Sequence, residues 1–277
     1  MKTIIVATDF SDAALNAANY AADMALATHA NLLLVHIYQI PVNYVEIPIA
    51  AAEDQTRMDA EETLSDLKEQ LIQRTGRNVT IANRFTAGVF FPELKAICED
   101  IKPYAVVMGS QGTTGAQRVL FGGHTVYAMK HLMWPLITIP PRARFSQIKK
   151  ICFACDFANV IDSTPVEEIK RLVNDFHAEL HVLNSGEEGS YHADTVFESG
   201  MLQEILAPLN PQYHLITGNS ADEGIIGFVE NNNIDLLITL PKRRPLLERL
   251  AHRSISKKLI LHSHIPVMAM HPTNSLL

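Results

Sequence analysis

The sequence MKTIIVATDFSD at residues 1–12 has a second version at residues 149–160, which read KKICFACDFANV. In each stretch a short apolar run ends in Asp followed by Phe, and the two aspartates are Asp9 and Asp156. Short β-rich runs with apolar residues on both faces are typical of strands in a buried parallel sheet. The repetition therefore indicates that one fold occurs twice in the chain.

The repetition continues beyond the first strand. A second apolar run begins at Ala30 as ANLLLVHI and at Ala178 as AELHVLNS, and further runs alternate with helical segments. We expect one domain over residues 1–141, a second over residues 147–277 and a short linker between them. Alternating strands and helices predict an α/β fold of two tandem doubly wound domains, each with a five-stranded parallel sheet.

The last strand of each copy, PLITIP and PVMAMH, is expected at an apolar edge of its sheet. Pairing the two strands antiparallel, about a pseudo-twofold axis within one chain, would hide edges that otherwise invite aggregation. Two chains could also associate as a homodimer.

Two helix starts carry local signals. Ser11 is expected to cap an Ala-rich helix that runs to about Ala27. In the second copy, Thr164, Pro165 and Glu167 predict an N-cap, a first-turn proline and a capping-box glutamate. Each signal places a helix after the first strand of its copy.

The composition limits the classes of function. The 277 residues are 47% hydrophobic and 19% charged, which is enough apolar material for sizeable cores. A net charge of −7 argues against a nucleic-acid coat, which needs a basic face. No apolar run approaches the ~18 residues of a membrane span, and the three cysteines cannot build a disulfide framework. We expect a cytoplasmic protein that binds neither nucleic acid nor membrane.

A glycine-rich loop, MGSQGTTGAQRVLFGGHT, follows the fourth expected strand at residues 108–125. Gly109 and Gly112 would let the backbone turn tightly and approach a ligand without interference from a Cβ atom. In a doubly wound sheet, ligands bind outside the carboxyl ends of the strands. Asp9 stands at such an end and could accept hydrogen bonds from a ribose or a base edge.

The end of this loop has the character of an anion site. Gly122 and Gly123 would open a helix over residues 124–132, whose free N–H groups and positive dipole end suit phosphate. Thr125 adds a hydroxyl donor in the first turn, and Arg118 could reach an anion from the loop.

The loop resembles the signature of the universal stress protein family: Gly, two residues, Gly, nine residues, Gly and a small hydroxyl residue. Gly109, Gly112 and Gly122 fit this spacing, and ATDFS and LVHI resemble the ends of the family's first two strands. Because the likeness covers both copies, the chain resembles the tandem branch of that family, with an adenine nucleotide alpha hydrolase-like fold and a degenerate second domain.

Family members with this signature bind ATP. The resemblance thus implies a stress-response protein that binds ATP, with or without Mg²⁺, in its first domain and senses or signals nucleotide state. The nucleotide contacts implied by the resemblance and by the loop are Ala7, Thr8, Asp9, Ile37, Met108, Gly109, Gly112, Arg118, Gly122, Gly123, His124 and Thr125.

The loop also departs from the family pattern. Gly123 replaces the family's serine, and His124 replaces a small apolar residue, so one hydroxyl contact to phosphate is lost. Thr125 or His124 could replace that contact, and we expect binding to persist with affinity at most weakened. Glycine-rich turns also serve tight packing alone, which is the alternative reading of the loop.

The corresponding loop of the second copy, at residues 240–258, lacks the glycines. Leu240, Arg243 and Arg253 stand in their places, and Pro241 has no N–H to offer, so a backbone cradle for a triphosphate is not expected. The loop is nevertheless strongly basic. It could bind another anion, or it could be a solvated turn of a structural partner domain. Its basic residues are Lys242, Arg243, Arg244, Arg249 and Arg253.

Other signals favour structure over chemistry. Cys152 and Cys155 have the spacing of a redox or zinc motif, but on a strand their side chains would point to opposite faces of the sheet. His262 and His264 could share a strand face and bind a metal, although no third ligand is evident.

Two other functions stay open beside nucleotide sensing. One is slow ATP hydrolysis, which the loop does not favour because it offers donors but no evident base to activate water. The other is a structural or interaction protein that binds no nucleotide.

Overall fold

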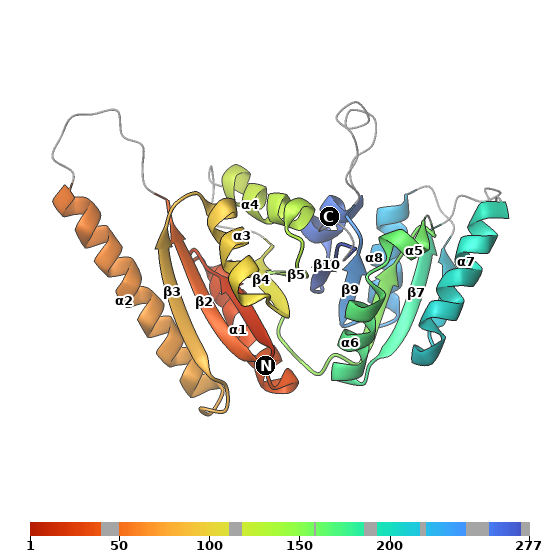
Figure 1. Ribbon diagram of the computed structural model, residues 1–277, viewed down its shortest axis with the longest axis horizontal. Coiled ribbons are helices and arrows are strands. Elements are labelled where there is room, and N and C mark those ends of the chain that lie inside the picture. Colours follow the sequence, from red (N-terminus) through yellow and green to blue (C-terminus); the bar gives the residue numbers. More distant parts are fainter. Residues whose placement is uncertain are drawn as a thin grey trace.

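The computed structural model describes residues 1–39, 50–110, 118–157, 159–185, 193–216, 220–241 and 255–272. Within these residues the strands form one 10-stranded sheet (Figure 1). The strands of the first half are β1 (Thr3–Ala7), β2 (Asn31–Tyr38), β3 (Ile81–Ala87), β4 (Ala105–Gly109) and β5 (Leu136–Ile139). Those of the second half are β6 (Lys150–Ala154), β7 (Glu179–Ser185), β8 (Gln212–Ile216), β9 (Leu236–Thr239) and β10 (Val267–Ala269).

Helices alternate with these strands and cover both faces of the sheet (Figure 1). In the first half they are α1 (Asp12–Thr28), α2 (Ala50–Arg74), α3 (Phe90–Ile101) and α4 (Arg118–His131). In the second half they are α5 (Val160–Ser163), α6 (Val166–Phe176), α7 (Ala193–Leu206), the 3₁₀ turn Ala207–Leu209, α8 (Ala221–Asn231) and α9 (Ile255–His262).

The two halves have the same topology, and the predicted fold class is confirmed. From its outer edge inward, the first half has the order β3-β2-β1-β4-β5, and the second has β8-β7-β6-β9-β10. Neighbouring strands within each half are parallel. The direction of winding reverses between β1 and β4, and also between β6 and β9. At such a switch point the loops after the strands diverge and leave a crevice.

The core consists of two apolar layers, one on each face of the sheet. Alternate residues of β1 enter different layers, with Ile4 in one and Ile5 in the other. Cys155 and Cys152 are divided in the same way, as expected from their spacing. Burial raises the pKa of Cys152 to about 12, which keeps its thiol protonated and unreactive. Cys152 is thus a packing residue, and Cys155 packs in the opposite layer.

Helix α1 forms as the sequence predicts. The Oγ atom of Ser11 accepts a hydrogen bond from the backbone N–H of Ala14, at 3.2 Å, and caps the helix. At the other end, His29 takes a left-handed conformation that stops it. Most of the alanines of α1 are buried, and their small side chains bring the helix axis close to the sheet.

Helix α4 begins earlier than predicted. Its first residue is Arg118 rather than His124, so Gly122 and Gly123 lie inside the helix instead of opening it. The first four N–H groups of a helix have no partner within the helix. Since the described part of α4 already includes Arg118, these groups lie upstream of the two glycines.

The predicted capping box of the second half is also wrong. Pro165, not Thr164, is the N-cap of α6, and no side chain caps that helix. Thr164 instead ends the short helix α5, because its N–H donates to the carbonyl of Val160 at 3.1 Å. The hydroxyl of Thr164 is buried without a hydrogen bond in the part of the chain that the structure describes.

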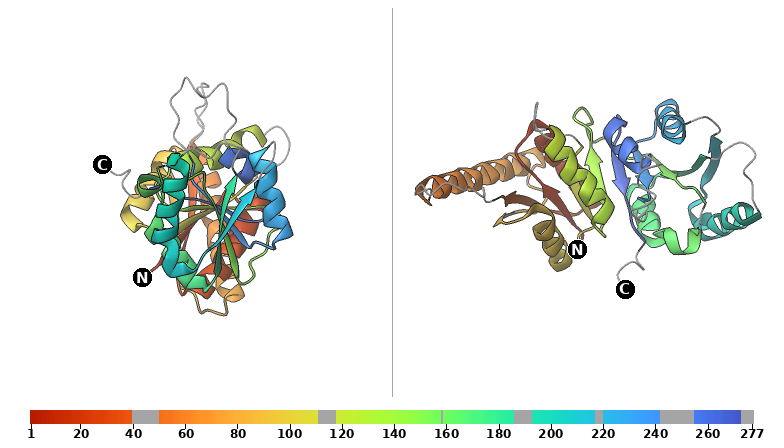
Figure 2. Two further views of the ribbon diagram at one scale, coloured as in Figure 1. Left: turned by 90° about the vertical axis from the view of Figure 1, so that its right-hand side faces the viewer. Right: turned by 90° about the horizontal axis from the view of Figure 1, so that it is seen from above.

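The two halves join edge to edge at β5 and β10, which pair antiparallel (Figure 2, right). Ile137 lies opposite Met268 in this register. This is the arrangement that the sequence led us to expect.

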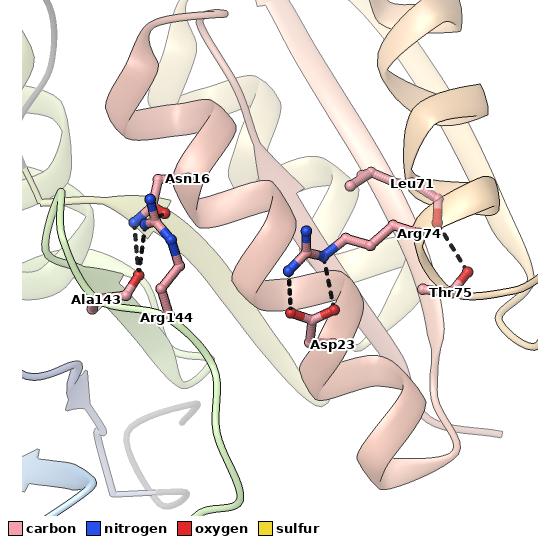
Figure 3. Close-up of polar contacts among 7 residues, drawn as sticks. All are labelled: Asn16, Asp23, Leu71, Arg74, Thr75, Ala143 and Arg144. Atoms are coloured by element: carbon pink, nitrogen blue, oxygen red, sulfur yellow. Dashed lines mark hydrogen bonds and ion pairs between the residues drawn. The ribbon is translucent and has the colours of Figure 1, made fainter.

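The chain that leaves β5 is fastened to α1 (Figure 3). The Asn16 side-chain amide donates to the backbone carbonyls of Pro140 and Ala143, both at 3.0 Å, and Arg144 donates to Oδ1 of the Asn16 side chain. On the other side of α1, Arg74 of α2 makes two hydrogen bonds to Asp23, at 2.8 and 2.7 Å. Helix α1 is therefore held on both sides.

Candidate functional site

A pocket of about 280 Å³ lies at the switch point of the first half, beyond the carboxyl ends of β1, β2 and β4. Its volume is close to the lower end of the range for small-molecule sites. Most of the contacts expected from the sequence line it: Ala7, Thr8, Asp9, Ile37, Met108, Gly109, His124 and Thr125. The fold therefore brings together residues from four separate segments of the chain.

Four of the expected contacts are not among the lining residues. Gly123 is an exposed residue of α4, and a Cβ atom added to it would meet nothing within 4 Å. Arg118 and Gly122 belong to α4, but their side-chain positions lie outside the described part, as does the whole of Gly112. The nucleotide contacts expected of these four residues stay a prediction, as do those of the eight lining residues.

Several lining residues were not singled out from the sequence: Ser11, Ala14, His36, Tyr38, Gln39 and Phe90. For two of them the sequence offered a feature that could have placed them at the site. His36 belongs to the LVHI run that resembles the family's second strand, and Ser11 is the predicted helix cap. Phe90 reaches the pocket from the start of α3, which no local pattern indicates.

The turn after β1 holds Asp9 in place. Phe10 has a positive φ of 63°, and its N–H donates to Thr8 Oγ1 at 3.0 Å. Asp9 Oδ1 accepts from both the N–H and the hydroxyl of Ser11, at 3.1 and 2.6 Å. Within the described chain Oδ2 makes no hydrogen bond, so it is the carboxylate oxygen available to a ligand.

His36 supports this turn from the neighbouring strand. Its Nδ1 lies 2.9 Å from the carbonyl oxygen of Thr8, and because a carbonyl only accepts, Nδ1 carries the proton. Its ring stacks on Phe10, with centroids 4.5 Å apart. Burial lowers the pKa of His36 against the opposing effects of the Thr8 carbonyl and the Asp9 charge. At neutral pH the ring is uncharged, which leaves Nε2 as an acceptor.

Gly109 is required by packing. A Cβ atom at this position would lie 2.9 Å from the carbonyl oxygen of Ala13 and 3.0 Å from its carbonyl carbon, so β4 and α1 could not approach as they do. The Thr125 hydroxyl donates to the Gly109 carbonyl at 3.2 Å and ties α4 to the same point. The sequence predicted that the missing Cβ of Gly109 lets the backbone approach a ligand. In the structure Gly109 lines the pocket, and its missing Cβ also lets β4 pack closely against α1.

His124 and Gln39 meet across the rim of the pocket. Their Nε2 atoms are 3.3 Å apart, a distance at which the Gln39 amide can donate to the imidazole. The His124 ring also contacts Phe90, with centroids 4.8 Å apart, and burial lowers the pKa of His124. Among the described lining residues none is Lys or Arg, and Asp9 is the one carboxylate. From the described lining, a bound anion would receive contacts from N–H groups and hydroxyls.

The second half keeps the turn but changes what surrounds it. Phe157 has a φ of 52°, and its N–H donates to Cys155 Sγ at 3.4 Å, as Phe10 does to Thr8. The Asn184 amide donates to the Cys155 carbonyl at 3.0 Å, in the place of His36. Leu240 stands in the place of Gly109. The five basic residues of the loop that follows lie outside the described residues.

The suggested histidine metal site is not formed as a strand pair. His262 ends α9 and His264 follows the helix, so the two do not share a strand face. In the described residues no group of three His, Cys, Asp or Glu side chains could hold a metal ion. Among those residues, no helix is both long and apolar enough to cross a membrane.

Comparisons with known proteins agree with the repeat. The model of the universal stress protein family matches residues 1–140 and again residues 147–271. A universal stress protein of Methanocaldococcus jannaschii is 25% identical over 142 residues, which is 50% of this chain and 81% of that protein.

Solved structures add to this likeness. A universal stress protein from Archaeoglobus fulgidus, 18% identical, covers 98% of this chain and 97% of its own with a TM-score of 0.74. A universal stress protein solved in complex with cAMP, 18% identical, covers 50% of this chain and 96% of its own with a TM-score of 0.38. The likeness to the Archaeoglobus fulgidus structure shows the fold, and the two family matches extend over both halves. The chain therefore belongs to the universal stress protein family and contains two tandem domains of it.

Proposed function

We propose that this protein binds an adenine nucleotide in the first-domain pocket and acts in the stress response as a nucleotide-dependent sensor or signalling module. The observation that carries the proposal is the pocket itself. It lies at the switch point of a doubly wound sheet and is lined by most of the residues that the family resemblance marks as nucleotide contacts.

The lining residues suit the nucleoside part of such a ligand. Asp9 Oδ2 can accept from a ribose hydroxyl, and its position is fixed because Oδ1 is already held by Ser11. Ile37 and Met108 supply apolar surface for a base. The pocket thus combines apolar surface with polar groups in fixed positions, as ligand sites do.

The phosphate groups require a different source of contacts from the one first expected. Because the described part of α4 already includes Arg118, its free N–H groups and positive dipole end lie upstream of Gly122. We propose that the phosphates, with any Mg²⁺ they bring, lie toward this end of α4. Binding without turnover is favoured, since Asp9 is the one carboxylate in the described lining.

Equilibrium binding of ATP to the full-length chain tests the proposal. Isothermal titration calorimetry with ATP and Mg²⁺ should give one site for the wild type and for Asp156→Ala, which changes the matching residue of the second domain. Asp9→Ala should bind at least tenfold more weakly, because the ribose loses a fixed, charged acceptor.

The same samples show whether the proposal fails. A wild type with neither binding heat nor a shift in melting temperature at millimolar ATP would refute nucleotide binding, because a ligand of the native state raises stability by mass action. Equal losses in Asp9→Ala and Asp156→Ala would place the site elsewhere. Phosphate release measured in parallel would detect turnover.

A further inference from the structure

One side chain of the second domain reaches into a helix of the first. His271 follows β10 and is 7% exposed, and its Nε2 lies 2.9 Å from the carbonyl oxygen of Met129 in α4. Because a carbonyl only accepts, Nε2 of His271 is the donor. The bond joins residues that lie in different domains and are separated by most of the second domain's sequence.

The Met129 carbonyl is one that the helix leaves without an intrahelical partner. Helix α4 ends at His131, so Met129 is among its last four carbonyls. The preceding carbonyl, of Ala128, accepts from the N–H of Leu132 at 2.8 Å. His271 thus does for Met129 what a C-capping group would do, but from another domain.

The reverse contact cannot form. With the spacing that relates Pro135 to Pro266, the residue that corresponds to Met129 is Ile260, and the one that corresponds to His271 is Pro140. A proline side chain has no donor to offer. The Pro140 carbonyl instead accepts from Asn16 within the first domain. At this pair of positions the second domain therefore donates a hydrogen bond to a helix of the first domain, and the first domain makes no equivalent bond to the second.

Helix α4 also supplies residues to the pocket. His124 and Thr125 stand on it, and the Thr125 hydroxyl is bonded to the end of β4. A helix is a stiff rod, so the placement of its C-terminal turn and the placement of the pocket residues are coupled. We infer that His271 is a positioning residue for the first-domain pocket, and that the second domain serves to orient α4.

Three variants of the full-length chain test this inference. His271→Phe keeps a ring but removes the donor, and His271→Gln keeps an N–H donor of similar reach. His264→Phe is the control, because its side chain is 83% exposed. If His271→Phe does not fold, His271→Asn replaces it, since its amide is too short to reach Met129.

Two measurements are compared. Amide hydrogen exchange in residues 124–131 should become about tenfold faster in His271→Phe and return to within about twofold of wild type in His271→Gln. The dissociation constant for ATP with Mg²⁺, which rests on the proposed function, should rise about threefold to tenfold in His271→Phe only. The control should match the wild type in both.

Each contrary result has its own meaning. Unchanged exchange in α4 of His271→Phe, or failure of His271→Gln to restore it, would overturn the inference. Faster exchange with an unchanged ATP dissociation constant would also overturn it, because His271 would then cap the helix without placing the pocket. A wild type that binds no ATP would refute the proposed function, and the exchange arm would then decide whether His271 holds α4.

Discussion

The first and second domains share a turn and differ around it. In both, the turn after the opening strand contains a left-handed phenylalanine whose N–H donates to the side chain two residues back. The neighbouring strand donates to the backbone carbonyl of that same residue. The donor is His36 in one domain and Asn184 in the other, and both place a nitrogen on Cγ. Because the domain without the glycines keeps this turn, the turn belongs to the fold rather than to ligand binding.

The contacts between the last two helices of each domain show where the domains diverge. In the first domain Phe91 and Tyr127 meet edge to face, with centroids 4.8 Å apart. At the matching positions of the second domain, Lys258 and Asp222 form an ion pair at 2.8 Å. The second domain thus has an ion pair where the first domain has an aromatic contact. It also has Leu240 where the first domain has Gly109.

The largest expected effect comes from giving the first domain the residue of the second. Gly109→Leu places a side chain against the backbone of Ala13, which cannot move without shifting α1. We expect a loss of about 3 kcal/mol in the free energy of unfolding, measured by urea denaturation, together with loss of ATP binding.

A second glycine provides the control for this prediction. Gly123→Ala adds a methyl group inside α4 where nothing lies within 4 Å, so stability should rise by up to about 1 kcal/mol. Similar losses in the free energy of unfolding in both variants would mean that glycine is needed at these two sites for a reason other than the close packing of α1 on β4.

A smaller effect is expected at the hydroxyl that ties the last helix of each domain to its sheet. Thr125→Val loses the bond to the Gly109 carbonyl, and Ser256→Ala loses the 2.9 Å bond between the Ser256 and Thr239 hydroxyls. Each change should cost about 1 kcal/mol of stability. Only Thr125→Val should weaken ATP binding in calorimetry, so equal affinities would remove Thr125 from the site.

The ion pair of the second domain should give a pH-dependent effect of at most about 1 kcal/mol. Burial alone would raise the pKa of Asp222, but hydrogen bonds from Lys258, Ser220 and the backbone, with the charge of Lys258, hold its pKa below the ordinary value. A lowered carboxyl pKa stabilises the native state above the unfolded-state pKa of about 3.9. That stability is lost as the pH falls through the folded-state pKa.

Lys258→Met removes the main cause of this shift. Urea denaturation should show wild type more stable than the variant at pH 7, with the difference closing in strong acid. A difference that stays constant down to pH 2 would mean that Lys258 acts through its aliphatic stem.

The smallest expected effect is at the outer edge of the second domain. His181 Nδ1 lies 3.0 Å from His214 Nε2, and burial, followed by the charges of His214 and Lys150, lowers the pKa of His181 against the opposing effect of Glu179. Burial also lowers the pKa of His214. A lowered histidine pKa gives stability that is fully present above the unfolded-state pKa of about 6.5 and declines as the pH falls toward the folded-state pKa.

His181→Leu introduces the residue that the first domain has at the matching position, Leu33. Stability measured in urea from pH 7.5 to pH 5 should decline less steeply in this variant than in wild type. The outcome that would contradict the assignment is an unchanged slope.

Local sequence signals predicted the strands well and the helix starts less well. The β2 strand and helix α1 follow from apolar runs and a cap that depend on near neighbours. The start of α4 was wrong because the residues before Gly122 can themselves be helical, and the glycines do not stop them. The capping box predicted at Thr164 was wrong because the Thr164 N–H, which Glu167 would have to accept, donates to the Val160 carbonyl of α5 instead.

The repeated apolar runs and the glycine spacing were enough to determine two tandem α/β domains and the strand ends at which a ligand would bind, since these depend on residues close together in the chain. Only the tertiary structure decided that Gly109 faces Ala13, that Phe90 and His36 join the pocket, and that His271 holds Met129. Such contacts join residues from distant segments. Their geometry is set by how helices pack on the sheet, which no local pattern encodes.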